Sequence, residues 1–94
     1  MNLNQYVHQV LIEENPYKDC LDIRDRYITY DEVAVLISDD LKELDGAKTT
    51  DHIKYWLSTE FGSENLDDYR VKRVCSRISQ MVNTDEVLDS FYNG

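Results

Sequence analysis

The sequence predicts a mostly all-α domain of five to six short helices, and three observations support this prediction. Apolar residues recur every three to four positions along nearly the whole chain, which is the spacing of one helix face. Residues that start and stop helices separate these stretches. The 94 residues include three glycines and one proline, which leaves little room for the turns of a β-rich fold. A chain of this length, 41% hydrophobic and 31% charged, is expected to form one domain.

The first helix is predicted to begin at Asn2, within an N-terminal extension that spans residues 1–28. Asn2 and Gln5 have the spacing of a capping box, in which each side chain bonds the other residue's backbone N–H. The stripe facing the core would consist of Leu3, Val7, Val10 and Leu11.

The stretch "ENPYKD" interrupts this helix and predicts the start of a short second one. Asn15 would be the N-cap and Pro16 the first helical residue, where proline's missing N–H costs no hydrogen bond. The second helix would run through Cys20 and Ile23, and "DRYIT" would then be a connector.

The third helix is predicted over residues 30–44, opened by a Thr29–Glu32 capping box and ended through Gly46. A fourth helix would start from Thr49 or Thr50 and stop at Gly62. The apolar faces are Val33, Leu36, Ile37, Leu41 and Leu44 in the third helix, and Ile53, Trp56, Leu57 and Phe61 in the fourth.

The fifth helix is predicted to begin near residues 65–68 and to continue to about residue 82. Its core face would consist of Val71, Val74, Cys75, Ile78, Met81 and Val82. Asn83 and Glu86 have capping-box spacing ahead of "VLDSFYNG", and residues 87–94 fit either a short helix or the first strand of a hairpin.

The stretch "RYITYDEVAVLI" resembles the end of a calcium-binding EF-hand loop but does not supply its ligands. With Glu32 at the last loop position, Leu21 and Ile23 would occupy ligand positions. Arg26 would stand where glycine makes the sharp turn. Only Asp25 and Glu32 remain as carboxylate ligands, whereas calcium takes six to eight oxygens. We therefore predict no metal site and no cofactor.

The net charge of −9 is the strongest overall property of the sequence. Such a charge repels nucleic acid and anionic membrane at long range and suits a basic partner. No apolar run approaches the ~18 residues of a membrane span, and no basic-then-apolar signal opens the chain. We predict a cytoplasmic protein without membrane contact. Cys20 and Cys75 lack neighbouring ligands at zinc-site spacing and are predicted to be free thiols.

Positive charge is concentrated in residues 70–77, "RVKRVCSR", which hold four of the ten basic residues and no acid. When the predicted core face of this helix packs inward, the opposite side points to solvent. That side consists of Tyr69, Arg73, Ser76, Arg77 and Gln80, with Arg70 and Lys72 flanking it. Two interpretations stay open: a free cationic face that binds a ligand, or a face neutralised by acidic neighbouring helices.

The segment "TTDHIKYWLSTEFGSENLDDYRVKRVCSRISQMV" resembles the helix–turn–helix core of winged-helix proteins. The matching residues are Thr50, Ile53 and Leu57 in the first helix, Gly62 in the connector and "YRVKRVCSRI" in the second helix. The resemblance covers residues 30–94. It implies a helix–turn–helix core over residues 29–82, with the tail, residues 83–94, in the place of a vestigial wing.

This resemblance implies a transcription regulator whose fifth helix binds DNA. The implied contacts are Tyr69, Arg70, Lys72, Arg73, Ser76 and Arg77. The planar fork of arginine can bond a phosphate or a guanine edge at two points, and most contacts would fall on phosphates. Binding of this kind is expected to weaken strongly with salt.

The alternative function is an acidic interaction module or inhibitor that imitates nucleic acid and binds a basic protein. This class resembles small acidic inhibitors encoded by phages. Its candidate carboxylates are Asp39, Asp40, Glu43 and Asp45, with Glu13 and Glu14 as further candidates. Val35 and Tyr55 lie off the core stripes and would suit a protein contact, a homodimer included.

An enzyme is the least supported class, because the sequence has no nucleophile elbow, phosphate loop or HExxH pattern. Asp67 and Asp68 are adjacent and point in different directions on a helix, so they do not form an acid–base pair. A thiol site would need His8 or His52 to meet a cysteine through the tertiary fold. We predict no catalytic residues.

Overall fold

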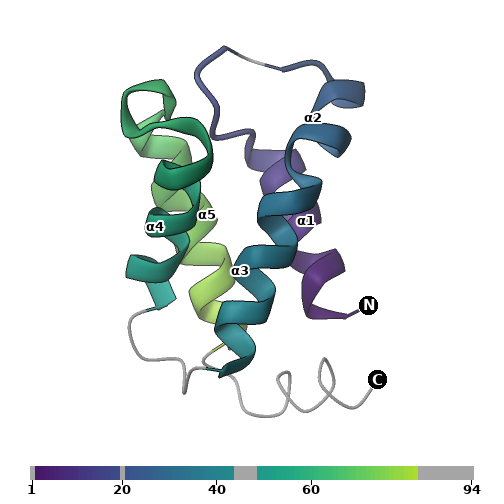
Figure 1. Cartoon of the computed structure of the whole chain (residues 1–94), viewed down its shortest axis with the longest axis vertical. Helices are drawn as coiled ribbons and strands as arrows, with labels where there is room; N and C mark the ends of the chain where they lie inside the picture. The colour runs from purple at the N-terminus through teal and green to yellow at the C-terminus, as the bar shows by residue number, and fades with distance from the viewer. Residues whose placement is uncertain (1, 20, 44–48, 83–94) are drawn as a thin grey trace.

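The computed structural model describes residues 2–19, 21–43 and 49–82 (Figure 1). Its helices are α1 (Leu3–Glu14), α2 (Ile23–Thr29), α3 (Asp31–Glu43), α4 (Thr49–Phe61), the short 3-10 helix η1 (Ser63–Asn65) and α5 (Asp68–Val82). Within these described ranges there is no strand, and one isolated bridge joins Tyr17 to Leu66. The predicted all-α fold is therefore confirmed.

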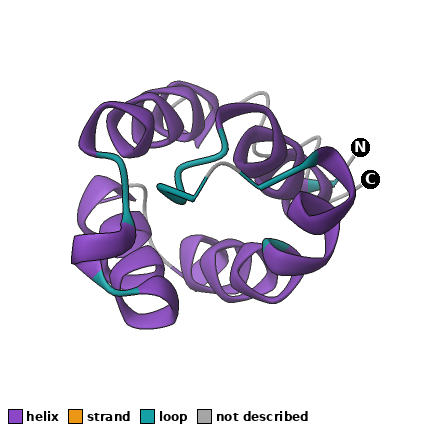
Figure 2. Cartoon of the chain, turned by 90° about the horizontal axis from the view of Figure 1, so that it is seen from above, coloured by secondary structure: helices purple, strands orange, loops and turns teal. Residues whose placement is uncertain are grey.

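Helices α1, α3, α4 and α5 form a ring in which each packs against the next (Figure 2). Successive members run in opposite directions, so that α1 and α4 run upward and α3 and α5 downward in Figure 1. This is the arrangement of an up-down four-helix bundle. The short helix α2 lies in the connection between α1 and α3 and packs against both.

Helix α1 belongs to this core, although the sequence placed it in an N-terminal extension. It closes the ring by packing against both α3 and α5. Its buried residues are Leu3, Val7, Val10, Leu11 and Ile12. Helices α3, α4 and α5 occur in the expected order, but they share one core with α1, and a helix–turn–helix unit among them stays a prediction.

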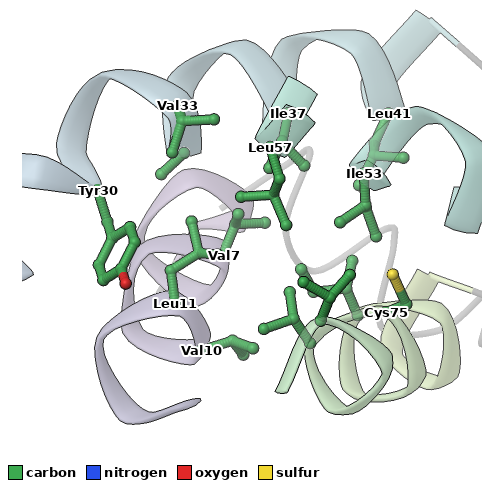
Figure 3. Packing of buried hydrophobic residues seen from close by; sticks show 14 of the residues in the cluster. Val7, Val10, Leu11, Tyr30, Val33, Ile37, Leu41, Ile53, Leu57 and Cys75 are labelled. Carbon is green, nitrogen blue, oxygen red and sulfur yellow. The ribbon is translucent and has the colours of Figure 1, made fainter. Parts of the chain in front are cut away.

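The hydrophobic core fills the centre of the ring and draws on all four of its helices (Figure 3). Besides the α1 residues, it comprises Tyr30, Val33, Ala34, Ile37, Leu41, Ile53, Leu57, Leu66, Val71, Val74, Cys75 and Ile78. The helical periodicity assigned all of the core residues to core faces except Ile12, Ala34 and the loop residues Tyr30 and Leu66. Four further residues predicted to face the core are only partly buried: Leu36, Trp56, Phe61 and Met81. The inward face predicted for α5 is thus confirmed from Val71 to Ile78.

The end of α1 differs from the prediction. Its capping box at Asn2 and Gln5 is present as expected. Asn15, however, is the C-cap of α1 in a left-handed conformation with φ of 48°, and its N–H donates to the Leu11 carbonyl at 2.8 Å. The prediction that Asn15 starts a second helix is wrong. Asparagine tolerates the left-handed region, so the same residue can end a helix.

The second helix lies later in the chain than predicted. It begins at Ile23, and the Asp22 side chain caps it by accepting from the Asp25 N–H at 3.0 Å. The stretch "DRYIT", residues 25–29, lies wholly within α2, so the prediction that it is a connector is wrong. Thr29 ends α2 rather than capping α3, which follows after the single residue Tyr30.

One end of the bundle is closed by a buried hydrogen-bonded tyrosine. Tyr30 is fully buried, and its hydroxyl donates to the Asn15 side chain at 2.7 Å and accepts from the Tyr17 N–H at 3.1 Å. The Phe61 ring meets the rings of Tyr30 and Tyr17 edge-on. Chain segments from α1, α3 and α4 are thereby joined at this end.

The stop at Gly62 is confirmed. Gly62 follows α4 with φ of 81° and ψ of 132°, a backbone conformation that side chains other than glycine's rarely adopt. Cys20, Leu44, Asp45, Gly46 and the whole tail from residue 83 lie outside the described residues, so the predictions made there stay predictions. No helix in the described ranges is both long and apolar enough to cross a membrane.

Candidate functional site

The basic face of α5 is bound by the end of α1. Arg73 Nε donates to Glu14 at 2.7 Å. Arg77 donates to both carboxylates, from Nη2 to Glu13 at 2.7 Å and from Nη1 to Glu14 at 3.0 Å. Two adjacent acids of α1 therefore hold two arginines that lie one turn apart on α5. We call these four residues the α1–α5 ion cluster.

The third arginine of this segment also bonds to the end of α1. Arg70 Nη1 donates to the backbone carbonyl of Asn15 at 3.1 Å, where the left-handed turn exposes that oxygen. Lys72 and Ser76 are exposed. Tyr69 is 68% exposed, and the Arg73 guanidinium lies 6.0 Å from its ring centroid, at the limit of a cation–π contact.

The α1–α5 ion cluster changes the pKa values of its members. The hydrogen bond from Arg77 lowers the pKa of Glu13. Burial acts to raise the pKa of Glu14, but the hydrogen bonds from Arg73 and Arg77 outweigh it, and the net shift is downward. The Glu14 side chain is only 11% exposed, so removing its partners would leave a charge that water reaches poorly.

This geometry bears directly on the DNA contacts implied by the resemblance. Those contacts required guanidinium groups that project into water without partners. Arg73 and Arg77 instead bond to carboxylates of their own chain, and Arg70 bonds to its backbone. Of the two interpretations left open by the sequence, the neutralised face is the one observed. A role of the six predicted residues in DNA binding stays a prediction.

The candidate carboxylates for a basic partner are distributed along α3. Asp39 and Glu43 are exposed, Asp40 is half-buried, and Asp45 lies outside the described residues. Glu13 and Glu14, also considered for this role, are engaged in the α1–α5 ion cluster. Of these candidate carboxylates, the exposed ones without a partner in the α1–α5 ion cluster lie on α3.

Asp40 organises a site that the sequence did not reveal. One of its carboxylate oxygens, Oδ2, accepts from His52 Nδ1 at 2.6 Å and from Trp56 Nε1 at 2.9 Å. His52 and Trp56 lie four residues apart on α4, so both point at α3 from the same face. The four-residue spacing of His52 and Trp56 can be seen in the sequence. Which acid meets these two side chains depends on how α3 packs against α4, and the sequence alone does not give that packing.

A pocket of about 420 Å³ lies at this place, lined by Asp40, Asp51, His52, Tyr55 and Trp56. Tyr55 is 59% exposed, as the sequence predicted. Its ring meets that of Trp56 edge-on, with centroids 5.1 Å apart and planes at 73°. The pocket therefore combines two carboxylates with two aromatic rings. We call it the α3–α4 pocket.

The remaining reactive groups do not form a catalytic arrangement in the described part of the chain. Cys75 is a buried free thiol, and burial raises its pKa, which disfavours the nucleophilic thiolate. His8 bonds to the Tyr27 carbonyl at 2.9 Å rather than to a cysteine. Among the described residues no group of three or more histidine, cysteine or carboxylate side chains could hold a metal.

Comparison with family models, with curated proteins and with solved structures finds no match to this chain. Its function is therefore argued from the geometry of the α1–α5 ion cluster and the α3–α4 pocket.

Proposed function

We propose that this chain is an acidic protein-interaction module that binds a basic partner protein through the surface formed by α3 and α4. The observation that carries the proposal is the α1–α5 ion cluster. Its carboxylates pair with two of the three arginines of α5, the most basic segment of the sequence. The chain has a net charge of −9, so its unpaired acidic side chains would attract a basic partner at long range.

Helix α3 is the part of the surface best suited to this role. Between Asp31 and Glu43 it carries five acids and one base, Lys42. Asp39 and Glu43 are exposed toward its C-terminal end. Acidic side chains there oppose the helix dipole, so a cationic partner would relieve an unfavourable interaction as well as form a new one.

The α3–α4 pocket adds aromatic side chains to this acidic surface. Tyr and Trp supply much of the binding energy of protein interfaces, because they bury a large area at low entropic cost. Tyr55 and Trp56 lie beside Asp40 and Asp51, so charge that steers a partner and rings that hold it occur together.

Nucleic acid is less favoured as a ligand by the same geometry. A phosphate would have to displace Glu13 and Glu14 from Arg73 and Arg77, and the largely buried Glu14 would lose its partners. Phosphates would also meet the repulsion of an acidic molecule over the roughly 8 Å across which charges act at physiological salt.

The test is a calorimetric titration with a peptide of alternating arginine and alanine, with a glutamate–alanine peptide as the control ligand. We expect the basic peptide to bind and its affinity to fall with salt.

Asp39→Asn/Glu43→Gln should weaken binding of the basic peptide about tenfold, since these carboxylates would form the contact surface. A matched control, Asp19→Asn/Glu64→Gln, removes the same charge from exposed sites outside α3 and α4 and should weaken it only about twofold. Equal losses in both variants, or no binding at low salt, would contradict the proposal.

A further inference from the structure

We propose that the α3–α4 pocket binds one arginine side chain of the basic partner, as the anchor of the complex. This inference rests on the proposed function and goes further, because it names the chemical group and the residues that receive it. Three properties of the pocket lead to arginine: its charge, its aromatic walls and the way Asp40 holds them in place.

The charge of the pocket requires a cation. Asp40 and Asp51 line it, and among the described residues neither lysine nor arginine does. His52 Nδ1 bonds to Asp40 Oδ2 at 2.6 Å. Asp51 adds a second carboxylate to the lining, which therefore suits a cation.

The walls of the pocket favour a flat cation over a compact, strongly hydrated one. The Tyr55 and Trp56 rings stand at 73° to each other, so a planar group stacked on one ring can turn its edge toward the other. A guanidinium is planar, weakly hydrated and stacks on aromatic faces, whereas the lysine ammonium holds its water more tightly. Asp51 is exposed and can present both oxygens to the guanidinium fork.

Asp40 acts as the positioning residue of this site. Its Oδ2 already accepts from both His52 and Trp56, which leaves the indole ring little freedom to rotate. A wall held in place before binding loses less conformational entropy when the ligand enters. The α3–α4 pocket is thus built for a cation before any partner arrives.

Trp56 is the only tryptophan in the sequence, so its fluorescence reports on the α3–α4 pocket alone. The probes are N-acetyl-arginine methylamide, the matching lysine compound and the arginine–alanine peptide. We expect the arginine probe to change the emission saturably, with about tenfold higher affinity than the lysine probe. The arginine–alanine peptide should produce the same change in emission at lower concentration.

Four variants form two matched pairs. Asp51→Asn removes a carboxylate of the pocket near the start of α4, and Glu64→Gln removes an exposed one in η1, which follows the end of α4. Tyr55→Leu removes a wall of the pocket, and Tyr69→Leu removes an equally exposed ring on α5. Asp51→Asn and Tyr55→Leu should each weaken the arginine probe about tenfold, whereas the two controls should leave it within about twofold. Circular dichroism confirms that each variant is folded.

The outcomes separate this inference from the proposed function. If the peptide binds but Asp51→Asn and Glu64→Gln weaken it equally and the emission is unchanged, the pocket proposal fails and the interaction module stands. If the small arginine probe binds in the pocket but the peptide does not bind, the pocket stands and the proposed function fails. Failure of both ligands overturns both proposals, and a lysine probe that binds as tightly as arginine overturns the choice of arginine.

Discussion

Tyr30 shows how much one buried hydroxyl can determine in this bundle. Its ring belongs to the core, while its oxygen satisfies the Asn15 side chain and the Tyr17 N–H at the closed end. These bonds explain why Asn15 ends α1 and turns the chain toward the bridge with Leu66. The sequence predicted Tyr30 as the first residue of the third helix. Its hydroxyl instead fixes a loop that lies 13 to 15 residues earlier in the chain.

Tyr30→Phe should lower the free energy of unfolding by about 1–3 kcal/mol, because it leaves a buried acceptor and a buried donor without their partner. Urea denaturation followed by circular dichroism measures this. Tyr55→Phe removes the hydroxyl of an exposed tyrosine and should change the stability by less than about 0.5 kcal/mol. Equal effects of the two substitutions would show that the Tyr30 hydroxyl is not the group that closes this end.

At the scale of elements, helices with a buried face were the predictable ones. For α1, α4 and α5 the apolar period and the stop signals gave bounds within about three residues of those observed. Helix α2 was misplaced because it buries none of its residues completely, and so carries no apolar period. Its N-cap, Asp22, was a readable signal, but the Asn15–Pro16 pair carried a stronger and misleading one.

The contacts between elements were beyond the reach of the sequence. Periodicity shows which side of α5 faces inward, and it correctly put Arg73 and Arg77 on the opposite side. It does not show that α1 packs alongside α5, which brings Glu13 and Glu14 to those arginines. The arginines and their carboxylate partners lie 59 to 63 residues apart in the sequence. The same limit applies to Asp40 of α3, which meets His52 and Trp56 of α4.

The α1–α5 ion cluster should make stability depend on pH. In the folded chain the pKa values of Glu13 and Glu14 lie below the ordinary 4.5. Their contribution to stability is therefore fully present above about pH 4.5 and is lost as the pH falls through the lower folded-state pKa values.

Urea denaturation between about pH 5 and about pH 3 measures this loss. The free energy of unfolding should fall less steeply for Glu13→Gln/Glu14→Gln than for the wild type, since glutamine has no proton to take up. The matched variant Asp19→Asn/Glu60→Gln should keep the wild-type slope. Parallel curves for all three proteins would mean that the cluster does not hold α1 to α5 in solution.

For the whole molecule, the order of the helices along the chain suggests DNA binding, whereas the way the helices pack favours a basic protein partner. The sequence from α3 to α5 resembles a helix–turn–helix protein, and that resemblance implied a recognition helix. The bundle places α1 against α5, so the arginines of that helix bond to the chain itself. Charge then has to be counted over the folded surface, where α3 carries five acids and one base, and two of the three α5 arginines have carboxylate partners.

A gel-shift experiment with generic duplex DNA at low salt tests this central claim most directly. We expect no shift for the wild-type chain, because Arg73 and Arg77 already have carboxylate partners and the net charge is −9. A shift that weakens with added salt and disappears in Arg73→Ala/Arg77→Ala would contradict it, since those guanidinium groups would then be binding phosphate instead of Glu13 and Glu14.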